Sequence, residues 1–340
     1  MTAVSFVIPI LNEARHVRAA VQSVLSQQGL AEREVILVLG RSTDGTTAIV
    51  EKLAREHSEI VVIHNSSNAI SRSMNLGTAA ARFDVVIRVD AHSVLSPDYA
   101  LRAAESLRAA GAANLGGRMK AEGSTPFESA VAWSYNSRIG LGGAIYHTGT
   151  EAGPAESAYL GVFDKAALVD IGGFDETLSR GEDWELNYRL RSSGQLVWFD
   201  PSLEVTYRPR STLRTLAKQF YASGRWRGEL IRRLGQRIPL RYFLPPAFVA
   251  VLGLGLMLSV VTLVAALFTP VWWVLPVAGV IPALGYLLWV VGATVVAKGI
   301  SGAAKSRLLV VLPCMHVCWG WGCLLGLFVR SRGLNSLAGR

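Results

Sequence analysis

Cysteine is absent from the first 313 residues of this 340-residue chain, which excludes a disulfide framework there. The three cysteines, Cys314, Cys318 and Cys323, lie in one apolar run. His316 lies between two of them, but thiols in an apolar helix are typical of small packing residues, and we expect that role rather than metal binding. A secretory signal is also absent, because the start MTAVSFVIP has no basic residue and leads directly into a predicted strand. We therefore expect the first part of the chain to lie in the cytosol.

Acidic residues are absent after Glu229. Residues 1–207 have a net charge of −6, whereas residues 208–241 carry ten Lys and Arg against Glu229 alone. Residues 242–340 add six basic residues. This positive charge lies directly before and between long apolar runs, where it favours anionic lipid headgroups as partners. The distribution argues against nucleic-acid binding.

Charged residues are missing from three apolar runs, 247–268, 271–297 and 308–329. Each run is long enough to cross the ~30 Å hydrocarbon layer as a helix. Three crossings from a cytosolic domain would leave the C-terminal arginines outside, against the positive-inside tendency. One run is therefore a candidate for a re-entrant or in-plane segment, either the one with Pro276 and Pro282 or the one with Pro313, Gly320 and Gly322.

The first 100 residues alternate apolar runs with segments of helical periodicity, as in βαβ units with a mainly parallel sheet. Strands are predicted at 4–9, 35–39, 60–64 and 85–89. Helices are predicted at 14–26, 46–56, 71–81 and 99–110. After them come a glycine-rich, loop-dominated region through Pro154, a short structured segment at 160–163, a helix near 183–192 and a strand near 197–199.

These patterns divide the chain into three parts. An α/β domain covers 1–207, basic amphipathic interfacial helices cover 208–246, and a membrane segment with two to three apolar spans covers 247–330. In an open α/β sheet, ligands bind at the carboxyl ends of the strands. The candidate site residues are therefore sought there.

Asp90 and His92 follow the fourth predicted strand. Alternate residues of an extended segment share a face, so both side chains could reach one cation. A divalent cation there would bridge diphosphate oxygens and stabilise charge on a leaving group. A solvated strand end is the alternative.

Glu182 and Asp183 form a carboxylate pair at the start of a predicted helix. A carboxylate within hydrogen-bond reach of an acceptor hydroxyl can act as its general base. Capping of the helix dipole is the alternative. Glu13, after the first strand, could face a nucleotide or lie in the first turn of a helix, and Arg72, after the third strand, could contact phosphate.

The ordered set of motifs resembles family 2 glycosyltransferases, which have the GT-A fold. The set consists of Pro-x-x-Asn-Glu at 9–13, Ser-Thr-Asp-Gly-Thr at 42–46, Asp-x-His at 90–92, Gly-Gly-Phe-Asp-Glu at 172–176 and Glu-Asp at 182–183. With the hydrophobic C-terminal part, the pattern is most similar to the succinoglycan-type exopolysaccharide glycosyltransferases of bacteria.

The resemblance implies roles for individual residues. They are a donor site at Pro9, Leu11, Glu13, Gly40, Arg72 and Asp90, a metal site at Asp90 and His92, and an inverting base at Asp183 with Glu182 beside it. Two positions depart from the family pattern: Leu39-Gly40 replaces an Asp that usually contacts the nucleobase, and His92 replaces a second Asp. Because histidine suits Mn²⁺ better than the hard cation Mg²⁺, we expect Mn²⁺ to be at least as effective as Mg²⁺.

The basic stretch at 213–227 has the spacing of an in-plane amphipathic helix. Arg225-Trp226 is similar to the Arg-Trp of processive family members, but Gln219 lies six residues before Arg225, so the expected Gln is missing and processive synthesis is not supported. We expect Arg225, Trp226 and Arg227 to guide a lipid-linked acceptor, with a simple stop-transfer collar as the alternative.

The sequence as a whole predicts inverting transfer of a sugar from a nucleotide-diphosphate donor, expected to be UDP-linked, to a membrane-held lipid-linked or polysaccharide acceptor. The setting is exopolysaccharide or cell-envelope assembly at the plasma membrane, with a multi-pass anchor and a cytosolic catalytic domain. A polyprenyl-phosphate sugar synthase, which needs no hydroxyl base, is one alternative. A non-catalytic scaffold that binds nucleotide or lipid is another.

Overall fold

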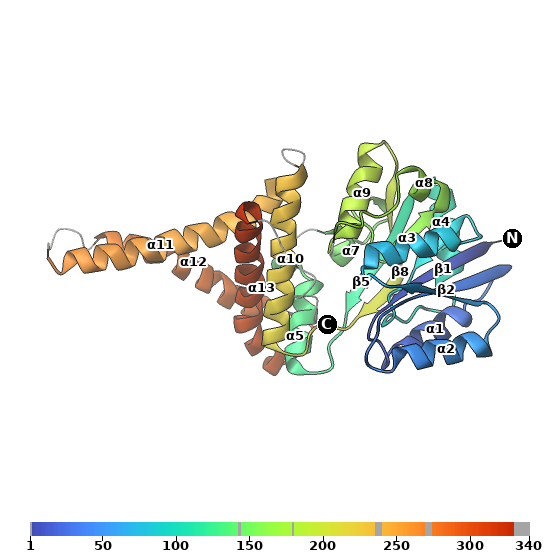
Figure 1. The fold of residues 1–340 in the computed structure, drawn as a ribbon. Coiled ribbons are helices and arrows are strands. Elements are labelled where there is room, and N and C mark those ends of the chain that lie inside the picture. Colours follow the sequence, from blue (N-terminus) through green and yellow to red (C-terminus); the bar gives the residue numbers. More distant parts are fainter. Residues whose placement is uncertain (1, 142–143, 179, 235–239, 269–273, 330–340) are drawn as a thin grey trace. The chain divides into compact units, whose positions relative to one another are not determined.

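The computed structural model describes residues 2–141, 144–178, 180–234, 240–268 and 274–329. The chain forms two compact units, whose elements are labelled in Figure 1. The first unit comprises 1–120 and 143–207, and the second comprises 121–142 and 208–340. The segment 121–142 therefore groups with the C-terminal helices, although the sequence placed it within the α/β domain.

The first unit is built from strands and helices that alternate along most of the chain. In chain order they are β1 (Ala3–Ile10), α1 (Val17–Leu25), β2 (Glu32–Gly40), α2 (Thr46–Glu56), β3 (Ile60–Asn65), α3 (Ile70–Ala80), β4 (Val85–Arg88), α4 (Tyr99–Ala110), β5 (Asn114–Ala121), α7 (Ile145–Thr148), β6 (Gly153–Pro154), β7 (Val162–Asp164), α8 (Lys165–Asp170), α9 (Glu182–Ser192) and β8 (Val197–Tyr207).

These strands form one mixed sheet in the order β3-β2-β1-β4-β7-β5-β8-β6. β1 pairs in parallel with β2 and β4, and β2 pairs in parallel with β3. β7 is antiparallel to β4 and β5, and β6 is antiparallel to β8. The α/β fold predicted from the first 100 residues is confirmed. The carboxyl ends of β1, β2 and β4 meet at one edge, where the candidate site residues lie.

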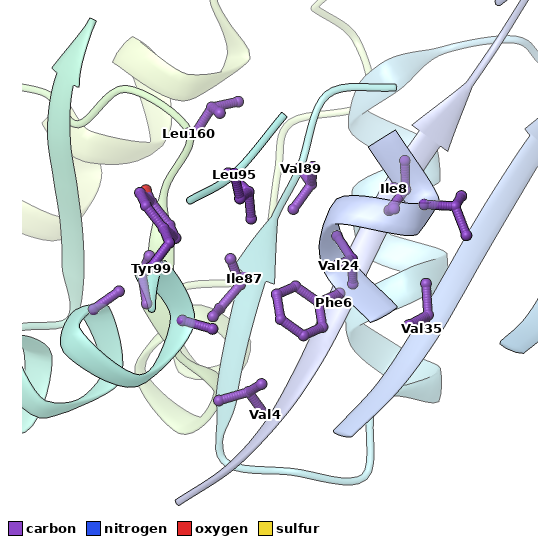
Figure 2. Packing of buried hydrophobic residues seen from close by; sticks show 14 of the residues in the cluster. Val4, Phe6, Ile8, Val24, Val35, Ile87, Val89, Leu95, Tyr99 and Leu160 are labelled. Carbon is purple, nitrogen blue, oxygen red and sulfur yellow. The ribbon is translucent and has the colours of Figure 1, made fainter. Parts of the chain in front are cut away.

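Alternate side chains of β1 enter two hydrophobic layers, one on each face of the sheet. Val4, Phe6 and Ile8 are fully buried on the face that α1 and α4 cover, as Figure 2 shows. Val7 lies in the other layer, where α3 packs. A Cβ at Gly77 of α3 would overlap the Val7 side chain, so glycine allows the helix to lie close to β1.

The region 111–154, expected to consist mainly of loops, contains regular structure, and that expectation is wrong. Two of its glycines, Gly116 and Gly117, lie in β5, where a Cβ at Gly117 would overlap the Leu203 carbonyl of the neighbouring β8. Glycine in a strand can mark such a close backbone approach. At Gly116 and Gly117, glycine reflects tight packing of a strand rather than a loop.

The second unit is helical. Its elements are α5 (Pro126–Tyr135), α6 (Arg138–Leu141), α10 (Leu213–Leu234), the 3₁₀ helix η2 (Leu240–Phe243), α11 (Leu244–Ala266), α12 (Val274–Val296) and α13 (Gly302–Phe328). α5 begins with a capping box, in which the Thr125 hydroxyl accepts from the Glu128 N–H and the Glu128 carboxylate accepts from the Thr125 N–H. α11, α12 and α13 are each long and apolar enough to cross a membrane, as predicted.

Candidate active site

The loops that follow β1 and β2 are joined by hydrogen bonds at the carboxyl edge of the sheet. Asn12 has a positive φ of 54°, and its N–H donates to Ser42 Oγ (3.0 Å) while its Oδ1 accepts from the Thr43 N–H (2.8 Å). The Glu13 N–H donates to the buried Thr46 Oγ1 (2.8 Å). The polar residues of both motifs therefore fix the backbone that carries the Glu13 side chain.

Three donor-binding candidates, Pro9, Leu11 and Gly40, come together at this edge. Pro9 pairs with Val38 in the parallel ladder, and Gly40 is the last residue of β2. A Cβ at Gly40 would lie 2.9 Å from Asn68 Oδ1 and 3.1 Å from Leu11 Cδ1, so close packing favours glycine there. Their contact with a nucleoside stays a prediction.

Arg72 lies at the start of α3, and its Nη1 is 3.9 Å from Glu176 Oε2. Both side chains are about half exposed, so water screens this pair and it can open at little cost. Nearby, the Asn75 side chain donates to the Phe174 carbonyl (2.9 Å) and accepts from the Phe174 N–H (2.8 Å). The glycine-rich turn at 172–176 is thus held against α3, and the contact of Arg72 with phosphate stays a prediction.

Glu13 and His92 meet across the adjacent strands β1 and β4. Glu13 is buried, and its Oε1 lies 3.2 Å from His92 Nδ1. β4 ends at Arg88, and the chain then turns, with the Ser93 N–H donating to the Asp90 carbonyl (2.8 Å). The assumption that Asp90 to His92 is extended is therefore wrong, because the turn directs the two side chains to different neighbours.

Arg88, the last residue of β4, joins three carboxylates. Its Nε and Nη2 each lie 3.2 Å from Asp90 Oδ1. Its Nη1 lies 3.3 Å from Glu182 Oε1 and 3.2 Å from Asp183 Oδ1. A buried charge has to be paired, and the Arg88 side chain is only 8% exposed. The guanidinium thus brings the end of β4 and the first turn of α9 into one site.

The cluster has more negative than positive charge when its three carboxylates are ionised. Burial and the neighbouring Asp183 raise the pKa of Glu182, although Arg88 opposes the shift. Burial alone would lower the pKa of Arg88, but the three carboxylates raise it overall, so the guanidinium stays charged. The Glu182 side chain is 6% exposed and that of Asp183 is 42% exposed, so Asp183 is the carboxylate of the pair that a substrate can reach.

Hydrogen bonds to the sheet fix the start of α9. Gly181, with a φ of 69°, precedes the helix. The Asn187 side chain donates to the Asp183 carbonyl (2.8 Å), and its Oδ1 accepts from the buried Asn114 side chain of β5 (2.6 Å). The helix start is therefore positioned from the sheet as well as through Arg88.

Among the residues that the structure describes, no three His, Cys, Asp or Glu side chains are grouped closely enough to hold a metal ion on their own. Asp90 and His92 would supply two ligands. One or two protein ligands are usual where substrate phosphates complete the coordination of the ion. The excess of negative charge around Arg88 also suits a cation. A metal held by Asp90 and His92 jointly with a donor diphosphate stays a prediction, because in the described structure Asp90 contacts Arg88 and His92 contacts Glu13.

Arg225, Trp226 and Arg227 lie on α10 in the second unit. The Arg227 guanidinium lies over the ring of Trp226 (4.7 Å) and over that of Tyr242 (4.4 Å), as in cation–π contacts. Trp226 is buried. Two of the three residues therefore contribute to packing within this unit, and their contact with an acceptor stays a prediction.

Arg88 is the site residue that the sequence reasoning missed. The sequence did contain a hint of its role. An arginine within the apolar run from Val85 to Val89 is buried if the run is an interior strand, and a buried charge requires acidic partners. The sequence did not show which acids they are, because Glu182 lies 94 residues further along the chain.

Comparison with known proteins identifies the family. Residues 5–168 match Glycosyl transferase family 2. The chain is 31% identical over 323 residues to the succinoglycan biosynthesis protein ExoA of Rhizobium meliloti (strain 1021), which covers 94% of each chain. It is 22% identical over 245 residues to the dolichyl N-acetyl-alpha-D-glucosaminyl phosphate 3-beta-D-2,3-diacetamido-2,3-dideoxy-beta-D-glucuronosyltransferase of Methanococcus voltae, which covers 68% of this chain and 75% of that protein.

A solved structure shares the fold at low sequence identity. The mannosyltransferase PcManGT from Pyrobaculum calidifontis, in complex with GDP-Man and Mn²⁺, superposes with a TM-score of 0.59 at 14% identity, covering 96% of this chain and 88% of that one. The resemblance seen in the motifs is confirmed. With its GT-A fold and its match to ExoA over nearly the full length, this chain belongs to glycosyl transferase family 2 and is a glycosyltransferase.

Proposed function

We propose that this glycosyltransferase carries out inverting, metal-dependent transfer of a sugar from a UDP-linked donor to a lipid-linked glycan at the plasma membrane, in exopolysaccharide or cell-envelope assembly. The observation that carries the proposal is the Arg88 cluster, which joins Asp90 with the Glu182–Asp183 pair. The name of the R. meliloti relative supports the exopolysaccharide setting, and the name of the M. voltae relative supports a lipid-linked acceptor.

Asp183 has the position that a base for the acceptor requires. Its carboxylate is partly exposed, and one oxygen is held by Arg88 at 3.2 Å. The acceptor hydroxyl would give its proton to the Asp183 carboxylate as it attacks the sugar on the face opposite the diphosphate. Glu182 is buried and cannot reach an acceptor, so its role is to hold Arg88 in place.

Asp90 and His92 would bind the diphosphate end of the donor. The bound metal would neutralise charge on the leaving diphosphate. Asp90 would orient both the diphosphate and Arg88, because its Oδ1 contacts the guanidinium. Glu13 would hold His92 through the 3.2 Å contact, and the loop that carries Glu13 is itself fixed by Ser42 and Thr46. The contact of Glu13 with His92 and the cluster of Arg88 with its three carboxylates are thus two sets of polar contacts, joined by the turn from Asp90 to His92.

The experiment is a donor screen with membranes that contain the protein, in which release of nucleoside diphosphate is measured with and without lipid extract. We expect release that requires lipid extract and a UDP-sugar. EDTA should abolish it and Mn²⁺ should restore it at least as well as Mg²⁺. Equal activity in EDTA would reject the metal assignment.

Asp183→Asn tests the base, with Asp98→Asn on the surface as a matched control. Loss of general-base catalysis is expected to lower kcat by about 10²- to 10⁴-fold while donor binding is retained. A polyprenyl-phosphate sugar synthase would show only a mild effect, because a lipid phosphate acceptor needs no base. Donor binding without turnover in the unaltered protein would instead indicate a scaffold.

A further inference from the structure

α13 is apolar enough to cross a membrane, yet other helices of the same unit cover much of it. In the most apolar 18-residue window of α13, 39% of the residues are buried, against 6% for α11 and 17% for α12. A helix that lipid surrounds exposes its apolar side chains on all sides. α11 has this property and α13 does not.

α10 and α13 are in direct backbone contact through glycine. A Cβ at Gly224 or Gly228 of α10 would overlap the backbone of α13, and a Cβ at Gly322 or Gly326 of α13 would overlap the backbone of α10. The contacts advance along both helices in the same direction, so the two helices are parallel. Small residues at a helix contact permit this close approach. α10 therefore accompanies α13 along the C-terminal half of α13.

α10 is too strongly charged to accompany α13 through a bilayer. Its charged residues are Arg214, Lys218, Arg225, Arg227, Glu229, Arg232 and Arg233. Glu229 pairs with Arg233 at 2.7 Å, but six basic residues cannot be neutralised by one acid. Charged side chains are costly within the hydrocarbon layer. The pair α10–α13 is therefore unsuited to a transmembrane position.

The middle of α13 also contacts a non-membrane segment of the chain. His316 Nε2 lies 3.0 Å from the Gly140 carbonyl of α6, and His316 Nδ1 lies 2.9 Å from the Tyr286 hydroxyl of α12. On α5, the Tyr135 ring packs edge-on against Phe220 of α10 at 6.0 Å. The short helices of 121–142 thus lie beside α13 at a level where a spanning helix would meet lipid.

Most of the large apolar side chains that α13 exposes lie on one face, and exposed Leu309 lies about 100° away from it. Val310, Val317, Trp321 and Phe328 are exposed and are spaced by seven, four and seven residues, which places them along one side of a helix. A single apolar face is typical of a helix that lies in the membrane interface.

α11 and α12, in contrast, form an apolar hairpin. Their backbones approach at Gly255 and Gly279, and the Ser259 hydroxyl donates to the Pro276 carbonyl (2.8 Å). Apolar side chains are exposed around most of both helices. Within the second unit, Figure 1 shows this hairpin extending away from α10 and α13, which run side by side.

We propose that only the hairpin α11–α12 crosses the bilayer, and that α10 and α13 lie together at its cytosolic surface. The exposed face of α13 would enter the boundary between headgroups and acyl chains, and the basic residues of α10 would meet anionic headgroups. This arrangement does not depend on the reaction proposed above. Its tests measure topology and depth, not transfer.

Two crossings also remove the conflict with the positive-inside tendency. The hairpin returns the chain to its starting side, so Lys298, Lys305 and Arg307 lie in the cytosol. The arginines at 330, 332 and 340 lie outside the residues that the structure describes, and in sequence they follow a helix that does not cross. Leu267 and Phe268, which follow α11 and carry no charge, are then on the other side.

Single-cysteine labelling tests the number of crossings. Phe268→Cys, Ser306→Cys and Val329→Cys are made in a chain whose native cysteines are replaced by alanine, and a membrane-impermeant maleimide is applied to right-side-out and inside-out vesicles. We expect Phe268→Cys to react only from outside, and Ser306→Cys and Val329→Cys only from the cytosolic side. Reaction of Val329→Cys from outside, or of Phe268→Cys from the cytosolic side, would overturn the proposal.

A reporter fused to the C-terminus of the otherwise unaltered chain covers the case in which the cysteine-free chain does not fold. A cytosolic reporter supports two crossings, and an external one overturns them.

Depth measurements test the position of α13. Spin labels at 310, 317, 321 and 328 in vesicles of phosphatidylethanolamine and phosphatidylglycerol should all report one shallow depth. Labels at Leu254 and Val261 of α11 are the matched controls and should report depths near the bilayer centre. A depth that passes through the centre along α13 would show a third span. Labels on α13 without any lipid contact would show that protein covers this face, and either result would overturn the proposal.

Discussion

Replacing Arg88 with methionine would test whether its guanidinium holds the site together. Methionine keeps much of the buried volume of the side chain but removes the charge, so Asp90, Glu182 and Asp183 would lose their shared cation. Arg88→Lys is the matched variant, because lysine keeps the charge but lacks the planar fork that contacts all three carboxylates. Both variants are compared with the unaltered full-length chain in detergent.

The geometry sets the size of the expected effect. Arg88 and Glu182 are 8% and 6% exposed, with 3.3 Å between Nη1 and Oε1, and breaking such a buried pair costs about 3–5 kcal/mol of unfolding free energy. The contact with Asp183 adds less, because that side chain is 42% exposed and water screens it. We expect Arg88→Met to lose about 3–5 kcal/mol near neutral pH, and Arg88→Lys to lose less.

The unfolding free energy that Arg88→Met loses should depend on pH. Burial and Asp183 already raise the pKa of Glu182, and in Arg88→Met no guanidinium opposes that shift. A carboxyl whose pKa is higher in the folded state destabilises the fold as pH rises from its unfolded pKa of ~4.3 through the folded value. In the unaltered fold the pKa of Glu182 is about 8, so Arg88→Met should fall further below the unaltered chain in stability as pH rises through that value. The double variant Arg88→Met with Glu182→Gln should be less sensitive to pH.

Hydrogen exchange of β4 and of the first turn of α9, corrected for the intrinsic effect of pH, measures these changes locally. A local measurement is needed because the two units need not unfold together. Arg102→Met removes an exposed pair with Asp98 and is the control, with an expected change within about 1 kcal/mol. A loss below about 1 kcal/mol in Arg88→Met, or an equal loss at both ends of the pH range, would refute the reasoning.

Three further predictions concern the scaffold of the first unit. Burial alone would raise the pKa of Glu34, but hydrogen bonds from neighbouring groups lower it overall, so its stabilisation is present above ~4.3 and is lost as pH falls through the folded value. Glu34→Gln should therefore flatten the acid side of a plot of melting temperature against pH. Gly77→Ala should destabilise by about 1–3 kcal/mol in thermal unfolding, because the added Cβ would overlap the buried Val7. Thr46→Val removes the hydroxyl that accepts from the Glu13 N–H and should cost about 1–3 kcal/mol, whereas Thr46→Ser should be close to the unaltered chain.

The sequence could predict the parts of the fold that depend on local periodicity. β1 to β4 and the helices between them lie close to their predicted ranges, because apolar runs and amphipathic spacing report burial directly. β5 was missed because its glycines permit close contact with segments far along the chain, Gly117 with Leu203 of β8 and Gly116 with Ala158. The candidate site showed the same limit. Asp90, Glu182 and Asp183 were predicted from residue type and order, and their roles stay predictions, whereas the role of Arg88 depends on partners that only the folded chain brings near.

α13 shows why composition cannot assign a transmembrane span on its own. Hydropathy measures how favourable lipid would be around a helix, and α13 and α12 have the same mean hydropathy of 1.9. It does not measure what already covers the helix. α12 exposes large apolar side chains around most of its surface, whereas α13 is covered in part by α10, α11 and α5 and exposes most of its large apolar side chains on one side. The same apolar side chains that would stabilise a span can instead hold a charged helix such as α10 at the membrane surface. Contacts with that charged neighbour are the observation on which we propose the interfacial position for α13.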